Sequence, residues 1–548
     1  MKKLLCVLVC LVVLGACDSS SDSNPKEPYP GPKPQEPLSL IFGVMSDTHI
    51  GGATLEGIST MVRLQRAYEK FALLYPEMDA IVTVGDITED GTLEEYNTYK
   101  SIMNQYSTAK NNLLSMGNHD NFQITGDAAV ERFSSVFGSK ATDDKVINGY
   151  HFITVSTKDD EYNTTTYKDH KTWLDGRLAA ANAEDPRKPI FVFIHHTMAS
   201  TGLIGSKQAE AVGDGDLYDV FKKYSQVVTF SGHSHVSTAD PRNIWQGDYT
   251  ALNCGAVHYA AVDCTHLLTK GKTDNAVDVD FAQAPTNRGE SSTALIVEVR
   301  GTVVTVRRID NYWNVEIPTT FVFDTSVDKS NFPYLEAKRI AASSAPQFAP
   351  GAKIILDKVM DKAVEYTLPQ AFTNSSTRPD DGAYTYSVTI KEVGGNVVSD
   401  ILLQAENFML PRRATVSHKT PYNTLQPDTS YEITIKPIGF FGKVGAAITA
   451  TFKTYEEGQG PVRESFPIPV AFLPGANLLP STGVPMNMFI GMLATGFTLA
   501  DVTTMFGEPV FFRDAALSQP FTGTDMIDIN TIIHSIIPLE SLLSLVGA

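Results

Sequence analysis

The stretch SLIFGVMSDTH, residues 39–49, decides the fold that the sequence predicts. Residues 39–45 are a short, mainly apolar run, as expected for a strand covered on both faces. Similar runs lie at 80–84, 112–116, 190–194 and 226–230, and helical patterns lie between them at 55–75, 92–105 and 167–182. This alternation of buried strands and helices predicts an α/β layered domain.

Acidic, amide and imidazole side chains follow each of these five strands. They are Asp47 and His49; Asp86; Asn118, His119 and Asp120; His195 and His196; and His233 and His235. Six of the twelve histidines of the chain lie there. Because ligands bind outside the carboxyl ends of strands in open α/β sheets, we expect these side chains to converge on one site.

Seven of these side chains are candidate metal ligands: Asp47, His49, Asp86, Asn118, His195, His233 and His235. Mixed nitrogen and oxygen ligands suit Zn, Mn, Fe or Co, and seven are too many for one tetrahedral zinc. Two metals that share a carboxylate would use all seven, and such pairs promote in-line displacement at phosphorus. The alternative for any single residue is a hydrogen-bonded polar side chain at a strand end.

In chain order the motifs are Asp47-Thr48-His49, Gly85-Asp86, Gly117-Asn118-His119-Asp120, His195 and Gly232-His233-Ser234-His235. They resemble the metallophosphoesterase superfamily, also called calcineurin-like phosphoesterases, whose pattern is D-x-H, G-D, G-N-H-[DE], H and G-H-x-H. The resemblance covers residues 38–325. It implies a four-layer α/β sandwich with a dinuclear metal site at the strand ends.

The resemblance also implies a role for each ligand. One metal would take Asp47, His49, Asp86 and His235, and the other would take Asp86, Asn118, His195 and His233. The Asp86 carboxylate would then bridge the two metals. The cofactors would be two divalent or trivalent transition metal ions (Mn, Fe or Zn), and a metal-bound hydroxide would be the nucleophile.

The same resemblance makes His119 and Asp120 the catalytic candidates: His119 would help protonate the leaving oxygen, and Asp120 would orient it. Two interpretations of His196 are open, since it either lines the substrate cleft or exchanges roles with His195. His258 is a candidate for the substrate pocket, with a structural role as the alternative.

Residues 85–91, Tyr96 and Trp173-Leu174 resemble the class III cyclic-nucleotide phosphodiesterase group. The chain departs from that group at Thr197-Met198, where a proline is common. It departs from purple acid phosphatases at Glu89, where their metal-binding tyrosine stands.

The N-terminus, residues 1–17, resembles a bacterial lipoprotein signal that ends in Leu14-Gly15-Ala16-Cys17, with Cys17 lipidated. A plain signal peptide is the alternative. Residues 18–37 are rich in Ser and Pro and predict a tether. The expected location is the bacterial cell envelope, lipid-anchored on the periplasmic face or the cell surface. Cys254 and Cys264 either pair or stay as buried thiols.

The C-terminal half predicts a linker at 326–350, an all-β domain at 351–455 and an unassigned region at 456–548 with an apolar helix at 531–546. The segment 425–431, LQPDTSY, resembles the L-x-P-x-T-x-Y signature of fibronectin type III domains, in which Tyr431 would form a tyrosine corner. The expected role is a spacer or a cap on the catalytic domain, or contact with a glycan or a protein.

The net charge of −18, from 44 Lys and Arg against 62 Asp and Glu, argues against binding of nucleic-acid duplexes. It does not exclude a phosphate ester, since metal ions supply positive charge locally. The predicted function is an exported, metal-dependent phosphoesterase acting on phosphomonoesters or phosphodiesters, including phospholipid head groups. The alternative is an inactive surface lipoprotein that binds through its β-sandwich.

Overall fold

The computed structural model describes residues 37–159, 166–204, 206, 217–261, 288–373, 382–405 and 410–461, and in the C-terminal part 466–470, 473, 479–480, 482–493, 498–506, 509–513, 517, 519–528 and 530–536. The chain divides into two units, Met1–Pro37 and Leu38–Ala548. The predicted signal, Cys17, the tether up to residue 36, and Cys264 lie outside the described residues. No helix among the described residues is long and apolar enough to cross a membrane.

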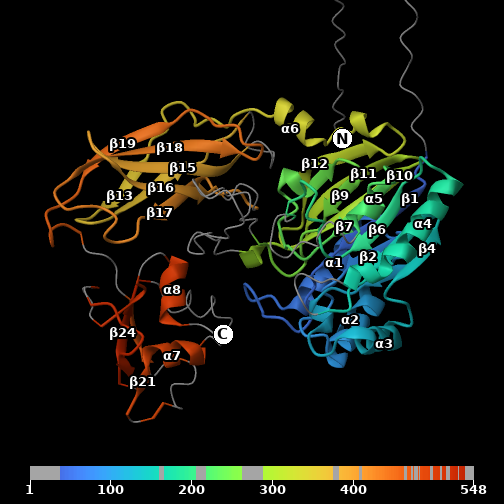
Figure 1. Cartoon of the computed structure of the whole chain (residues 1–548), viewed down its shortest axis with the longest axis horizontal. Coiled ribbons are helices and arrows are strands. Elements are labelled where there is room, and N and C mark those ends of the chain that lie inside the picture. The colour runs from blue at the N-terminus through green and yellow to red at the C-terminus, as the bar shows by residue number, and fades with distance from the viewer. Residues whose placement is uncertain are drawn as a thin grey trace, which may run out of the picture. The chain divides into compact units, whose positions relative to one another are not determined.

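Two six-stranded sheets form the N-terminal part (Figure 1). The first has the order β12-β11-β10-β1-β2-β3 and the second β4-β5-β6-β7-β9-β8. The first sheet comprises β1 Leu40–Met45, β2 Ala80–Val84, β3 Asn112–Ser115, β10 Thr293–Arg300, β11 Val303–Asp310 and β12 Val315–Asp324. The second comprises β4 Asp143–Ile147, β5 Tyr150–Val155, β6 Ile190–Ile194, β7 Val227–Ser231, β8 Ile244–Gln246 and β9 Thr250–Asn253. Strands β1, β2 and β3 run parallel, as do β5, β6, β7 and β9.

Apolar side chains of the two sheets pack face to face. Phe42 of β1 contacts Phe152 and Phe191 of the second sheet, with ring centroids 4.9 Å apart in both pairs. Because strands covered on both faces need apolar residues at every position, this explains the continuous apolar runs in the sequence. The predicted mixed α/β fold is confirmed.

Helices cover the outer faces of both sheets. They are α1 Thr60–Leu74, α2 Leu93–Tyr106, α3 Gly126–Phe137, α4 Lys171–Glu184 and α5 Tyr218–Phe221. Helices α1 to α3 share a core with the first sheet, and α4 and α5 share one with the second. Local signals set their starts: Ser59 caps α1, and Thr92 with Glu95 forms a capping box on α2. The layers are therefore helix, sheet, sheet, helix.

Residues 355–453 form two further sheets, of order β13-β14-β17 and β16-β15-β18-β19, around a shared apolar core. Their strands are β13 Ile355–Val359, β14 Val364–Pro369, β15 Ala383–Glu392, β16 Val397–Gln404, β17 Thr415–Lys419, β18 Ser430–Gly439 and β19 Ile448–Lys453. The buried Tyr431 hydroxyl accepts a hydrogen bond of 2.7 Å from the backbone amide of Gln426. The predicted contact between the Tyr431 hydroxyl and the backbone upstream of it is thus present.

The predicted linker contains helix α6, Glu336–Ala342. Arg339 of this helix donates to the carbonyls of Ile244 and Pro241 at 2.8 and 2.5 Å. These hydrogen bonds connect α6 to the first residue of β8 and to the turn that precedes this strand. The segment is therefore packed against the catalytic part, although its Pro-containing sequence predicted a linker.

The C-terminal region has its own small core. Its elements are β20 Phe466–Pro469, β21 Val484–Pro485, α7 Met486–Leu493, α8 Leu499–Phe506, β22 Phe511–Phe512, β23 Met526–Ile527 and β24 Ile532–Ser535. The helix predicted at 531–546 is wrong in its described part, because β24 pairs with β20 and β22. A short apolar run does not distinguish helix from strand, and tertiary pairing decided this one.

Cys254 is a fully buried free thiol in the core between the two large sheets. Burial raises the pKa of this thiol well above its ordinary value, and Asp47 acts in the same direction. Of the two alternatives for Cys254, the structure has the buried thiol.

Candidate metal centre

The carboxyl ends of five strands carry the seven predicted ligands. Asp47 and His49 follow β1, Asp86 follows β2, Asn118 follows β3, His195 follows β6, and His233 and His235 follow β7. Strands β1, β2 and β3 belong to the first sheet, and β6 and β7 belong to the second. A contact between a ligand that follows β1, β2 or β3 and one that follows β6 or β7 therefore joins the two sheets.

Asp47, His49, Asp86 and His235 form one group, whose ligand atoms all lie within 4.8 Å of one another. The Nε2 atom of His235 lies 3.1 Å from Oδ1 of Asp47 and 3.1 Å from Nε2 of His49. The Nε2 atom of His49 lies 3.7 Å from Oδ2 of Asp86. Two imidazoles and two carboxylates this close together suit Zn, Mn or Fe.

Asp86, His195 and His233 form a second group. Nε2 of His195 lies 3.2 Å from Oδ2 of Asp86. Asp86 belongs to both groups, so its carboxylate would be shared by two metals held there.

Asn118 is fully buried, and within the described part of the chain neither atom of its side-chain amide has a hydrogen-bond partner. Leaving a buried polar group unsatisfied costs about 1–3 kcal/mol. A metal ion bound to Oδ1 would satisfy the carbonyl of this amide. The donor set and the orphaned amide therefore fit a dinuclear metal site.

Five of the seven predicted ligands have left-handed backbone conformations. Their φ angles are 53° for Asp47, 45° for His49, 46° for Asp86, 66° for His233 and 53° for His235. Non-glycine residues rarely adopt such angles, and they persist where the surrounding structure fixes them, commonly at functional sites. Here backbone bonds fix the turn after β1, since the amides of Asp47 and His49 donate to the carbonyls of Gly85 and Asp86.

Two motif glycines allow close approach of the loops. A Cβ atom on Gly117 would collide with Oδ1 of Asp86, and one on Gly232 would collide with Ser46 and Asp47. Glycine is needed at both positions because the backbone itself packs against the carboxylates that would hold the metals.

The Nδ1 atoms of two ligand histidines are held by neighbouring acceptors. Nδ1 of His195 lies 2.8 Å from the carbonyl oxygen of Val84. Nδ1 of His49 lies 2.8 Å from Oε2 of Glu89. These contacts leave Nε2 of both rings for a metal, as outer partners of metal-bound histidines do. Sequence reasoning gave Glu89 no such role; its position three residues after Asp86 was the available signal.

Buried charges in the metal-free site stabilise one another. Burial acts to raise the pKa of the Asp86 carboxyl, but the imidazoles of His195 and His119 hold it well below its ordinary value. Burial acts to lower the pKa of His195, but Asp86 and Asp47 raise it to about 9. The carboxylates therefore retain positive charge nearby, a role that metal ions would take over.

His119 lies at the edge of this cluster, with its ring centroid 4.6 Å from that of His49. Its Nδ1 lies 2.8 Å from the carbonyl oxygen of Glu89, so that Nδ1 carries the proton and Nε2 is left for the substrate. The orienting group is therefore the Glu89 carbonyl, in place of the Asp120 carboxylate expected from the sequence.

The Asp120 carboxylate instead holds the surrounding loops. It accepts hydrogen bonds from the amides of Gly117, Ile87 and Thr88, and from the Thr88 hydroxyl. The nearest acceptor for the His119 ring is a backbone carbonyl because the 3-10 turn His119–Asn121 directs Asp120 back toward the loop after β2.

His196 is buried beside the ligand cluster. Its Nδ1 lies 3.0 Å from the Tyr167 hydroxyl, and its ring centroid lies 4.1 Å from that of His233. Burial, reinforced by His233 and His195, lowers its pKa well below the ordinary value, so the ring is neutral. His195, and not His196, is the member of the ligand group that contains Asp86 and His233. The ring of His196 packs against that of His195.

His258 reaches the site from the loop after β9. It is 4% exposed, its Nε2 lies 2.9 Å from the carbonyl oxygen of Ala53, and its ring centroid lies 5.6 Å from that of His49. Burial lowers its pKa to about 3, with His49 acting in the same direction, so the ring is neutral. His258 thus lies beside the ligand cluster.

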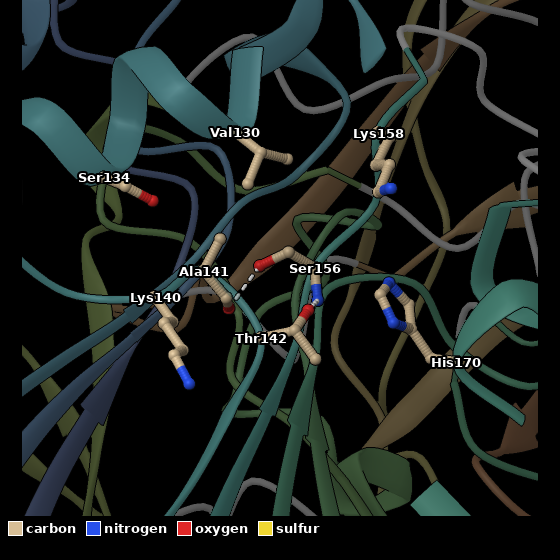
Figure 2. A pocket seen from close by; sticks show the side chains of 8 residues that line it. All are labelled: Val130, Ser134, Lys140, Ala141, Thr142, Ser156, Lys158 and His170. Atoms are coloured by element: carbon tan, nitrogen blue, oxygen red, sulfur yellow. Dashed lines mark hydrogen bonds between the residues drawn. The ribbon is translucent and has the colours of Figure 1, made fainter. Parts of the chain in front are cut away.

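A separate cavity of about 230 Å³ lies between helix α3 and the ends of β4 and β5 (Figure 2). Its lining residues are Val130, Ser134, Lys140, Ala141, Thr142, Ser156, Lys158 and His170. The Ser156 hydroxyl donates to the carbonyl of Ala141 at 2.7 Å (Figure 2). The lining contains none of the predicted site residues.

Comparison with known proteins agrees with this geometry. Residues 40–237 match the family model of calcineurin-like phosphoesterases. The chain is 24% identical over 208 residues to a 3',5'-cyclic-nucleotide phosphodiesterase of Nostoc sp., covering 36% of this chain and 73% of the relative. It is 26% identical over 234 residues to a probable glycerophosphodiester phosphodiesterase of Arcobacter nitrofigilis, covering 41% of this chain and 81% of the relative.

Among solved structures, the chain is similar to a purple acid phosphatase from seeds of yellow lupin, Lupinus luteus, with 12% identity and a TM-score of 0.38. That match covers 54% of this chain and 55% of the lupin chain. The family of the matching model uses two metal ions, and the Asp and His cluster is compatible with such a pair. The chain thus carries a calcineurin-like metallophosphoesterase domain and is a phosphoric ester hydrolase.

Proposed function

We propose that this chain is an exported phosphodiesterase that uses two transition metal ions to hydrolyse small phosphodiesters. The observation that carries the proposal is the convergence of six metal-ligating side chains from two sheets, together with Asn118, whose buried amide has no hydrogen-bond partner among the described residues. Asp47, His49, Asp86 and His235 would hold one ion. Asp86, Asn118, His195 and His233 would hold the other.

When bound, two such ions supply Lewis acidity, lower the pKa of water and stabilise charge on phosphate oxygens. The protein residues orient the reacting groups and protonate the leaving oxygen. The Asp86 carboxylate stands between the two groups, and its Oδ1 accepts the backbone amide of His119 at 3.0 Å. This contact positions His119 at the metal site, where the ring, protonated on both nitrogens, would donate its Nε2 proton to the leaving oxygen.

The diester preference rests on the relatives. One is named a cyclic-nucleotide phosphodiesterase and the other a probable glycerophosphodiester phosphodiesterase. Phosphomonoesters and phospholipid head groups belong to the same chemical class, and a substrate panel separates them.

The test is hydrolysis of bis(4-nitrophenyl) phosphate and 4-nitrophenyl phosphate by the purified chain with Mn²⁺, Fe²⁺ or Zn²⁺. We expect metal-dependent turnover, with the diester preferred. We expect Asp86→Ala to lose at least about 10³-fold in kcat, because the shared ligand is removed from both groups. Absence of turnover with every metal, or full activity of Asp86→Ala, would refute the proposal. Fewer than one bound metal per chain would favour the inactive binding lipoprotein.

We infer export and lipid anchoring from residues 1–37 alone, with Cys17 as the lipidated residue. Cys17→Ser should release the protein from the membrane fraction, and unchanged fractionation would count against the anchor. The fibronectin type III assignment of residues 351–455 is likewise a proposal. Two sheets around one core and the Tyr431 contact support it. A spacer, a cap, or glycan or protein contact are its candidate roles.

A further inference from the structure

Next to the metal ligands lies a pair of hydrogen-bond acceptors to which the proposed mechanism gives no contact with the substrate: Glu89 and His258. With His49 they form a third group, whose ligand atoms lie within 4.8 Å of one another. His258 is 4% exposed, and its Nδ1 is buried without a hydrogen-bond partner among the described residues. The side chain of Glu89 is 36% exposed, so the pair is open to solvent on one side.

The pair presents acceptors and no donors. The Nε2–H group of His258 donates to the carbonyl of Ala53, which leaves the Nδ1 lone pair of the neutral ring as an acceptor. Glu89 is a carboxylate that already accepts Nδ1–H of His49 on Oε2. A partner of this pair must therefore bring hydrogen-bond donors.

A third metal ion explains the pair less well. Nε2 of His49 faces Asp86 and His235, and its Nδ1 is bonded to Glu89. A third metal held by Glu89, His258 and Nδ1 of His49 would make His49 a ligand of two different metals, because its Nε2 belongs to the first ligand group. Without His49, only two protein ligands remain, fewer than the three or four that zinc sites use.

Gly52 brings the backbone close to the pair. A Cβ atom on this residue would lie 2.8 Å from Oε2 of Glu89 and 3.1 Å from Cε1 of His258. Glu89 and His258 therefore both adjoin position 52, and any side chain there would crowd them.

The pair also lies on the leaving-group side of the site. The backbone carbonyl of Glu89 orients His119, the group that would protonate the leaving oxygen. The side chain of the same residue belongs to the acceptor pair. The pair therefore adjoins the residue that would protonate the leaving oxygen, and the proposal below takes the leaving alcohol to reach it.

We propose that Glu89 and His258 form a subsite that selects phosphodiesters whose leaving alcohol carries a hydroxyl or ammonium group. The subsite rests on the proposed phosphodiesterase function. It distinguishes polyol and amino-alcohol esters from plain alkyl or aryl esters. A buried acceptor left unpaired by an apolar leaving group weakens binding, which is the physical basis of the selection.

The test measures inhibition of bis(4-nitrophenyl) phosphate hydrolysis by three near-isosteric diesters: methyl propyl, methyl 2-hydroxyethyl and methyl 2-aminoethyl phosphate. The Mn²⁺-loaded full chain is used. We expect at least one donor-bearing diester to have a Ki about tenfold below that of the propyl diester. The hydroxyl and ammonium compounds distinguish a polyol site from an amino-alcohol site.

Three variants locate the effect. The Ki ratio should fall close to one in His258→Phe and Glu89→Ala, which remove an acceptor, and in Gly52→Ala, whose Cβ crowds both side chains. His258→Gln, which keeps an acceptor, should retain a larger ratio than His258→Phe. His151→Phe and Glu94→Gln, away from the cluster, are the matched controls and should keep the ratio of the original chain.

A ratio of one in the original chain, or a ratio that His258→Phe and Gly52→Ala leave unchanged, would overturn the subsite. A stoichiometry of three metals that drops to two in His258→Phe would also overturn it in favour of a metal site. Failure of the aryl diester to turn over would instead refute the phosphodiesterase function. The two failures are therefore distinguishable.

Discussion

At the scale of single residues, several candidate metal ligands have features that destabilise the fold. Asn118 is buried and its amide has no hydrogen-bond partner among the described residues, and the ligand residues Asp47, His49 and Asp86 hold left-handed backbone angles. Both features cost free energy in the metal-free protein. They are explained if metal binding repays part of that cost, since a ligand that binds only the folded state stabilises it.

Asn118→Leu tests this at one position. Leucine has a similar volume and no polar atoms, so we expect the metal-free variant to be more stable than the original chain by about 1–3 kcal/mol. We expect the same variant to lose metal-dependent hydrolysis. Urea unfolding in EDTA measures the first effect and an aryl diester assay the second. A metal-free variant less stable than the original would show that the amide is satisfied.

At the scale of elements, strand ends and helix starts follow different rules. Helix α2 begins where Thr92 and Glu95 form a capping box, a signal that is local in the sequence. The end of β11 depends instead on a buried carboxylate. Oδ1 of Asp310 accepts hydrogen bonds from the amides of Tyr312 and Trp313, at 2.9 and 3.1 Å, and thus holds the turn to β12.

Asp310 makes the stability of this turn depend on pH. Burial raises its pKa from 3.8 to about 7, against the opposing effect of the amides that it accepts from and of Arg63. Because the folded state binds the proton more tightly than the unfolded chain, this residue costs no stability below pH 3.8 and increasingly destabilises the fold as pH rises to 7.

Asp310→Asn keeps an acceptor for both amides and removes the ionisation. The free energy of unfolding of the original chain should fall between pH 5 and pH 8. We expect the fall in the variant to be smaller by about 1–3 kcal/mol. Denaturant unfolding at both pH values gives the difference. Parallel pH dependence of the two proteins would contradict a raised pKa at this position.

At the scale of the whole molecule, the metal centre joins the two large sheets. The contact of His195 with Asp86 crosses from β6 to the loop after β2, so ion pairs within the cluster connect the two sheets. Metal ions bound there would hold both sheets at once. Metal loading should therefore stabilise the fold of the N-terminal part.

We expect Mn²⁺ or Zn²⁺ at about 100 times its Kd to add about 2.7 kcal/mol of stability, seen as a rise in Tm, and EDTA to reverse it. Differential scanning calorimetry measures both. Asp86→Ala is the control and should show a much smaller rise, because it removes the shared ligand. Equal rises in the two proteins would place the bound metal elsewhere.

The mixed α/β fold and the position of Asp47, Asp86 and His195 at strand ends were predictable from the amino-acid sequence. Both follow from short-range information: apolar runs form buried strands, and parallel strands end at one edge of a sheet. Strand lengths and helix caps are read from neighbouring residues, so the core positions of the strands were also predictable.

Which acceptor faces which histidine ring depends on contacts between distant parts of the chain. The carbonyl of Glu89 rather than Asp120 orients His119, and His258 joins the cluster from a loop more than 200 residues away from His49, since a contact across chain segments leaves no local pattern. The same reason explains the strand at 532–535, where pairing with β20 and β22 overrode an apolar run that suited a helix equally well.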